Sequence, residues 1–213
     1  MKQYKYILLD WDGNLARTLD IWLAALKVPL EKRGHFFSDE EIGANFTVFQ
    51  ERMEALGITD IDAMVAEADE IATREAPNVE LYPDALVTLD MLHKAGKKIA
   101  LVTTSRHGQI DPLLEKYKLQ DMFDLIVCGD DVTHHKPNPE PIERAIKLFG
   151  ATKVEAVMVG DAASDIRAAN NAGVDSVLFF PPEHAKFYDI EELRRLHPTH
   201  IIESFREIVH IAA

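Results

Sequence analysis

Four apolar stretches of this chain are each followed by residues that could do chemistry. These residues are the carboxylates Asp10 and Asp12, the hydroxyls Thr103, Thr104 and Ser105, the amine Lys136, and the carboxylates Asp161 and Asp165. Carboxylates can act as nucleophiles or transfer protons. Crowding them together is unfavourable without positive charge, which a hard cation such as Mg²⁺ supplies. A fixed lysine beside that cation suits a transferring phosphoryl group.

Each of these stretches also has a purely structural interpretation. A turn, a helix cap or a solvated lysine before a helix-starting proline would explain the residues as well. An acid in the first turn of a helix is likewise ordinary. Asp12-Gly13-Asn14 could be a turn, Thr104 or Ser105 a helix cap, and Lys136 a solvated lysine before Pro137. Asp161 and Asp165 could be a helix cap and a first-turn acid. Only the convergence of all four stretches favours a site.

These four apolar stretches and a fifth are typical of strands buried on both faces, because they lack polar alternation. They cover residues 6–9, 99–102, 125–128, 154–159 and 176–180. Helical patterns separate them, over residues 83–94, 108–116, 139–149 and 164–172. This alternation predicts an α/β fold, a Rossmann-like parallel sheet with helices on both faces. Ligands of such sheets bind beyond the carboxyl ends of the strands, where the polar residues follow.

One long segment interrupts the alternation. Residues 19–76 show only helical periodicity, with apolar positions that indicate helices within residues 21–30, 46–56 and 61–71. Residues 78–83 then lead back to the sheet. We therefore predict a core of residues 1–18 and 80–213 and an inserted helical cap of residues 19–79.

Composition excludes several classes of protein. The 213 residues are 47% hydrophobic and carry a formal net charge of −13, so nucleic acid and anionic membrane are poor partners. The first apolar run ends at Asp10, which is too short for a signal peptide, and no run could span a bilayer. The single cysteine, Cys128, lies in an apolar run and is expected in the core. We expect a cytosolic, cytoplasmic protein.

The order of the motifs resembles that of the haloacid dehalogenase superfamily of phosphatases and phosphotransferases. The sequence reads Asp-x-Asp-Gly from Asp10, a strand followed by Thr103, Lys-Pro at Lys136, and Gly-Asp-x-x-x-Asp ending at Asp165. The resemblance covers the whole chain, and the insert lies where that family places its cap. This placement is similar to that of phosphoglycolate phosphatases and β-phosphoglucomutases.

The resemblance implies catalytic roles. Asp10 would attack phosphorus and become an aspartyl-phosphate, and Asp12 would protonate the leaving oxygen and later accept a proton from water. Thr103 would hydrogen-bond the phosphoryl oxygens, and Lys136 would hold both the nucleophile and the phosphate. Because the dehalogenases of the superfamily lack an aspartate at position 12, halide displacement is disfavoured.

The resemblance also implies Mg²⁺ as cofactor. Asp10 and Asp161 would bind it through their carboxylates and Asp12 through its backbone carbonyl. Asp165 would orient the water shell or Lys136.

Further contacts to the substrate are expected from Thr104 and Ser105 and from the cap. Within residues 42–47, Asn45 and Thr47 could hydrogen-bond the ester and Phe46 could close over it. Equally, Gly43 could simply end a helix while Phe46 packs in the cap.

Two residues depart from the family pattern. Asn14 replaces the usual threonine, and Arg17 replaces an acid. Arg17 could contact substrate, but a surface ion pair is favoured. The adjacent His134 and His135 are interpreted as part of a solvated loop.

The function predicted is Mg²⁺-dependent hydrolysis of a small phosphate monoester, with a small phosphorylated metabolite as partner. A phosphomutase of the β-phosphoglucomutase type is the alternative among enzymes. From other classes, a receiver-like signalling module conflicts with the helical insert, and a catalytically silent scaffold conflicts with the complete set of acids.

Overall fold

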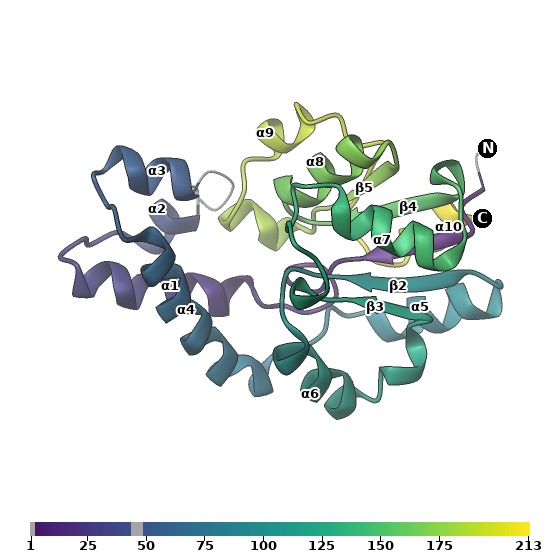
Figure 1. The fold of residues 1–213 in the computed structure, drawn as a ribbon, viewed down its shortest axis with the longest axis horizontal. Coiled ribbons are helices and arrows are strands. Elements are labelled where there is room, and N and C mark those ends of the chain that lie inside the picture. Colours follow the sequence, from purple (N-terminus) through teal and green to yellow (C-terminus); the bar gives the residue numbers. More distant parts are fainter. Residues whose placement is uncertain (1–2, 44–48) are drawn as a thin grey trace.

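The computed structural model describes residues 3–43 and 49–213 and contains a six-stranded parallel sheet (Figure 1). The sheet order is β3-β2-β1-β4-β5-β6, and every neighbouring pair is parallel. The strands are β1 (Tyr6–Leu9), β2 (Lys98–Val102), β3 (Leu125–Val127), β4 (Ala156–Gly160), β5 (Asp175–Phe179) and β6 (His200–Ile202). This order confirms the predicted Rossmann-like fold and places its topological switch point between β1 and β4.

Successive strand residues point to opposite faces of the sheet, and both faces are covered by helices. Ile7 and Leu9 pack with side chains of α5 (Ala85–Lys94), α6 (His107–Tyr117) and α10 (Glu207–Ala212). Tyr6 and Leu8 pack with α7 (Glu140–Phe149) and α8 (Ala163–Ala172). Burial on both sides explains why the strands are apolar throughout.

The predicted core elements agree with the structure except near their ends. The strand expected over residues 154–159 begins only at Ala156, because Lys153–Glu155 form a 3₁₀ turn. Thr152 fixes that turn by donating from its backbone nitrogen and its hydroxyl to Glu155. Beyond β5 the structure adds elements that were not predicted, the strand β6 and the short helices α9 (Ile190–Arg194) and α10.

The elements between β1 and α5 in the described chain are helices, and they lie within residues 19–79, the predicted insert. Its helices are α1 (Leu19–Lys32), α2 (Asp39–Gly43), α3 (Phe49–Ala55) and α4 (Ile61–Glu75). The helix α2 was not predicted. Its signal is a capping box, in which the backbone nitrogens of Ser38 and Glu41 each donate to the other residue's side chain.

The two chain segments that join the insert to the sheet run side by side. Arg17 donates from its backbone nitrogen to the Glu80 carbonyl at 2.8 Å, and Tyr82 donates to the Leu15 carbonyl at 3.0 Å. The insert also packs against α8 and residues 187–193 through a shared apolar cluster. These contacts hold the insert beside the loop that follows β1 (Figure 1).

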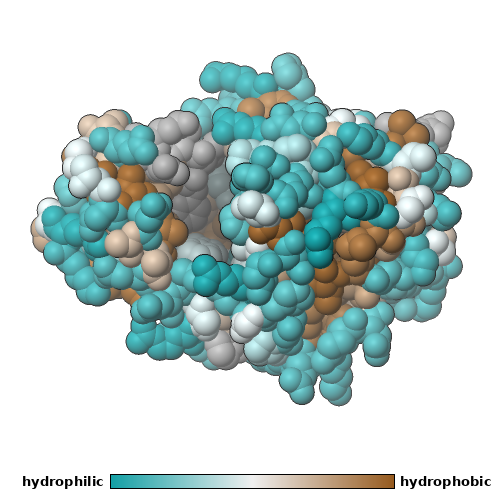
Figure 2. Space-filling model, viewed as in Figure 1, coloured by the Kyte–Doolittle hydropathy of each residue, from teal (hydrophilic) through white to brown (hydrophobic). Residues whose placement is uncertain are grey.

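The surface seen in Figure 2 is mostly hydrophilic and is hollowed between the insert and the body around the sheet. No helix in the described part of the chain has the length and apolar character needed to cross a membrane. Cys128 is fully buried directly after β3, as predicted, and burial raises the pKa of its thiol.

Candidate active site

Lys136 lies at the centre of the polar cluster beyond the sheet. Its ammonium group donates to Asp10 Oδ1 at 2.7 Å, to Asp165 Oδ1 at 2.6 Å and to the Val102 carbonyl at 3.1 Å. Burial alone would lower the pKa of Lys136, but Asp10 and Asp165 raise it, so the side chain stays charged. A solvated lysine, the structural alternative, is excluded because the side chain is only 2% exposed.

Three buried carboxylates share this region. One oxygen from each of Asp10, Asp161 and Asp165 lies within 4.8 Å of the others. Burial raises the pKa of Asp10 to about 7, although Lys136 opposes the shift. Burial, followed by the charges of Asp165 and Asp10, raises the pKa of Asp161 well above its usual value. A single lysine does not neutralise the three acids, and their oxygens are the ligands that a hard divalent cation prefers.

Asp165 has both structural and electrostatic contacts. One carboxylate oxygen accepts from the backbone nitrogen of Ala162 at 3.1 Å and so caps α8, while the other binds Lys136. Asp165 is thus the acid expected in the first turn of α8, and its bond to Ala162 orients the carboxylate that positions Lys136.

The loop after β1 is closely packed behind Asp10. Asn14 is fully buried and donates to the Asp10 backbone carbonyl at 3.0 Å, and the Gly13 nitrogen donates to the Thr18 hydroxyl at 3.0 Å. Gly13 has a φ of +67°, and a Cβ atom there would lie 2.2 Å from Asp161 Oδ2. Only glycine lets the loop approach Asp161 so closely.

Replacing Gly13 by alanine should therefore lower both stability and activity. The left-handed backbone alone costs about 1–2 kcal/mol for a residue with a Cβ, and the new methyl group must also displace Asp161. Gly34→Ala is the matched control, because Gly34 has a φ of +80° and nothing lies within 4 Å of the point that its new methyl group would occupy. Urea unfolding should show a loss for both variants, whereas phosphatase assays should show a loss only for Gly13→Ala. Equal activity in the two would contradict the close approach.

Asp12 accepts hydrogen bonds on both carboxylate oxygens. Trp22 of α1 donates from its indole nitrogen to Oδ1 at 3.1 Å, and the Ser105 hydroxyl donates to Oδ2 at 2.8 Å. The expected contact of Ser105 with the phosphate stays a prediction, and its hydroxyl here is bound to Asp12. The carboxylate is thus held jointly by the insert and by the sheet.

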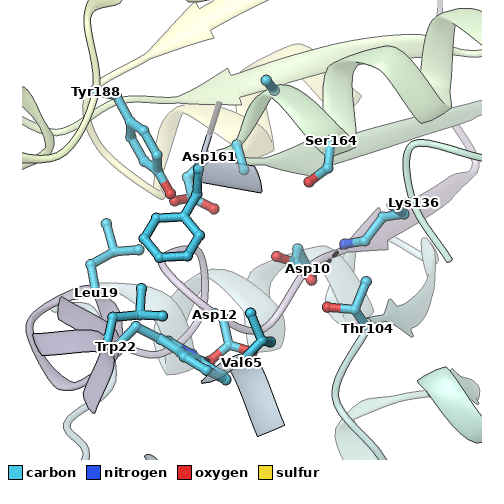
Figure 3. Close-up of a pocket in the computed structure, with 14 residues that line it drawn as sticks. Asp10, Asp12, Leu19, Trp22, Val65, Thr104, Lys136, Asp161, Ser164 and Tyr188 are labelled. Carbon is cyan, nitrogen blue, oxygen red and sulfur yellow. Dashed lines mark hydrogen bonds and ion pairs between the residues drawn. The ribbon is translucent and has the colours of Figure 1, made fainter. Parts of the chain in front are cut away.

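The two threonines after β2 differ in their surroundings. Thr103 is buried, and its hydroxyl accepts from the Ser105 backbone nitrogen at 3.1 Å. Thr104 lines the cavity beside Asp10 and Lys136 (Figure 3). The structure therefore brings Thr104 into the cavity directly, while Thr103 shapes the turn beneath it. Asn45 and Thr47 lie outside the described residues.

A cavity of about 320 Å³ opens above these groups, between the sheet and the insert (Figure 3). Its lining includes Trp22 of α1, already described, and also Ser164 of α8 and Tyr188. The Tyr188 hydroxyl lies against Asp161, and burial followed by the Asp161 charge raises its pKa. These three residues were not predicted as site residues. Only Ser164 could have been suspected from the sequence, because it lies three residues after Asp161.

Comparison with known proteins agrees with this geometry. The sequence pattern described as haloacid dehalogenase-like hydrolase matches residues 7–179, from β1 to the end of β5. The chain belongs to the haloacid dehalogenase-like hydrolases.

Relatives within the haloacid dehalogenase-like hydrolases extend over nearly the whole chain. It is 30% identical to a protein of Halalkalibacterium halodurans named pyrophosphatase PpaX, over 96% of this chain and 95% of the relative. A solved haloacid dehalogenase-like structure from Bacteroides fragilis is 28% identical, with a TM-score of 0.82 over 97% of this chain and all of the other. A Lactobacillus plantarum protein assigned as a phosphoglycolate phosphatase has the same TM-score at 20% identity, covering 98% and 99% of the two chains, and shows the shared fold.

Arg17, which departs from the haloacid dehalogenase pattern, and the two histidines before Lys136 lie at the surface. Arg17 lies 3.8 Å from Glu183, and both side chains are exposed, which confirms the expected surface pair. His134 is exposed and contacts Glu140 at 2.8 Å, and His135 is exposed beside it. The expected solvated loop is thus confirmed.

Proposed function

We propose that this haloacid dehalogenase-like hydrolase is a Mg²⁺-dependent phosphatase that hydrolyses a small phosphate monoester through an aspartyl-phosphate on Asp10. The observation that carries the proposal is the position of Asp10. It lies at the switch point of the sheet, bound to buried Lys136 and close to Asp161. An anionic nucleophile can approach an anionic phosphate only where positive charge offsets both.

In the first step, an oxygen of Asp10 attacks phosphorus and the bond from phosphorus to the ester oxygen breaks. Asp12 gives its proton to that oxygen, so the alcohol leaves neutral. In the second step, water attacks phosphorus and Asp12 takes its proton. The acyl phosphate bond breaks, which releases inorganic phosphate and regenerates the carboxylate of Asp10.

The contacts of Asp12 suit this alternation of proton states. A serine hydroxyl can donate to a carboxylate and can equally accept from a carboxylic acid, whereas an indole N–H only donates. Ser105 can therefore reverse its hydrogen bond when Oδ2 gains the proton, while Trp22 keeps Oδ1 in place.

The metal site would use the carboxylates of Asp10 and Asp161 and the backbone carbonyl of Asp12. Bound there, Mg²⁺ would offset the charge on the phosphoryl oxygens. Asp165 would act through Lys136, because both of its oxygens are already occupied by Lys136 and Ala162.

The insert, residues 19–79, would serve as the cap over the site. It supplies Trp22 to Asp12 and forms one wall of the cavity, so that it can exclude water during the first transfer. The names of the relatives reported above give no support to the mutase alternative.

Removal of the metal should abolish turnover. With excess EDTA, release of phosphate from an aryl phosphate should fall to background and return when Mg²⁺ is added in excess. As a readout independent of activity, Mg²⁺ should raise the thermal unfolding midpoint of the wild-type protein and do so less for Asp161→Asn, because a ligand of the native state stabilises it. Full turnover in EDTA would refute the role of the metal.

A further inference from the structure

The wall of the cavity that faces Asp10 is apolar. It consists of Leu19, Trp22 and Leu26 of α1, Phe49 of α3, Val65 of α4, and Tyr188. Figure 3 shows Tyr188, Leu19 and Trp22 along one side of the cavity and Asp10, Lys136 and Thr104 on the other. A substrate with its phosphoryl group at Asp10 would place its leaving group against this wall.

Positive charge is confined to the phosphoryl end of the cavity. Among the described residues that line it, Lys136 is the only lysine, arginine or histidine, and two aspartates bind it. Of the basic residues elsewhere in the insert, Lys27 pairs with Asp39, and Lys32 and Arg33 both pair with Glu67. Arg52 and Arg74 are exposed and do not line the cavity. The segment 44–48, outside the described residues, reads Ala-Asn-Phe-Thr-Val and contains no basic residue.

A charged leaving group would therefore meet no counter-charge. The site contains the carboxyl groups of Asp10, Asp12, Asp161 and Asp165 against one lysine, so even with a divalent cation it has no surplus of positive charge when all are ionised. The phosphoryl group of the substrate adds further negative charge. A second anionic group against an apolar wall would lose its hydration without a partner, which is strongly unfavourable.

We infer that the substrate is a phosphate monoester of an uncharged, largely apolar alcohol about the size of a single aromatic ring. The inference rests on the proposed phosphatase activity and deepens it. The cavity of about 320 Å³ is near the lower limit for pockets that hold small molecules, which favours a small alcohol. The three aromatic side chains of the wall suit a ring, which packs edge-to-face or offset against them.

This substrate class differs from those stated in the names of the relatives. Pyrophosphate and phosphoglycolate both carry a charged group, a phosphate or a carboxylate, on the leaving side. Among the described residues, the apolar wall has no basic side chain that could pair with either of these groups.

The test compares phosphate release by the full chain from phenyl phosphate, 2-phosphoglycolate and pyrophosphate at the same excess of Mg²⁺. We expect kcat/KM for phenyl phosphate to exceed both others by at least about tenfold, the factor that 1.4 kcal/mol of discrimination gives. Equal or better use of either anionic substrate would overturn the inference.

A pair of variants tests the wall itself. Val65 and Val28 are each 40% exposed on helices of the insert, but only Val65 lines the cavity. Val65→Lys should raise kcat/KM for 2-phosphoglycolate relative to phenyl phosphate by about tenfold or more, and Val28→Lys should leave the ratio unchanged. An unchanged ratio in Val65→Lys would show that this wall does not contact the leaving group.

Binding separates failure of this inference from failure of the proposed function. Calorimetric titration of the Mg²⁺-loaded chain would use phenylphosphonate and methylenediphosphonate, which resist hydrolysis. Tighter binding of phenylphosphonate supports the apolar subsite even if no ester is turned over, a result that would refute only the phosphatase activity. Tighter binding of methylenediphosphonate overturns the inference whatever the activity.

Discussion

Asp10→Asn should abolish turnover without unfolding the protein. An amide is a far poorer nucleophile than a carboxylate, and removing the nucleophile of a serine protease costs on the order of 10⁶ in kcat. In the wild type, Lys136 donates to Asp10 Oδ1 at 2.7 Å. The asparagine Oδ1 can accept the same hydrogen bond, so the local packing should persist. Steady-state kinetics on an aryl phosphate should show kcat reduced by several orders of magnitude.

The covalent mechanism can be examined directly in the same pair of proteins. Rapid quenching of the wild-type reaction should give a chain that is heavier by one phosphoryl group, with the modification on the peptide containing Asp10, and the variant should lack it. Asp90→Asn is a suitable control because Asp90 is an exposed partner of Lys94. Near-normal kcat in Asp10→Asn would eliminate the aspartyl-phosphate.

Lys136→Met should produce the second largest loss. Removing one preorganised electrostatic group from an active site costs about 10²–10³ in kcat. Lys136 also neutralises the buried Asp10 and Asp165, and breaking a buried ion pair by removing one partner costs about 3–5 kcal/mol of stability. Kinetics should show the loss of activity, and urea unfolding should show the loss of stability.

The double variant Lys136→Met with Asp165→Asn separates these two effects. It removes one of the carboxylates left without a partner, so part of the stability should return, whereas activity should remain low. Lys94→Met is the matched surface control, since the Lys94 side chain is 74% exposed. Recovery of activity together with stability would mean that Lys136 serves folding alone.

The core of the fold could be predicted because its strands are buried on both faces. Ile7, Leu8 and Leu9 are fully buried, and such continuous apolar runs leave a clear mark in the sequence. The edge strand β6 could not be recognised, because it is short and Ile201 is 40% exposed. The start of β4 was misplaced because Val154 is apolar but 61% exposed.

Part of the candidate site could likewise be predicted from the sequence, and part could not. Asp10 and Asp161 follow strands directly, so the parallel topology alone predicts that they meet. The contacts of Ser105 and Trp22 with Asp12 depend on how the insert and the turn after β2 are placed in space. Tyr188 lies far along the chain in a segment without regular periodicity, and only the packing of that segment brings it to Asp161. Local patterns contain no information about such contacts.

The hydrogen bond from Trp22 to Asp12 links helix α1 of the insert directly to the carboxylate proposed to transfer protons. Trp22 lies in the first turns of α1, and only the short loop from Gly13 to Thr18 separates that helix from Asp12. Any rotation of α1 away from the sheet therefore stretches this bond. The indole is also a fluorophore whose emission responds to a neighbouring carboxylate, and the chain's other tryptophan, Trp11, is buried in the core. The intrinsic fluorescence of Trp22 should therefore report movement of the insert relative to Asp12.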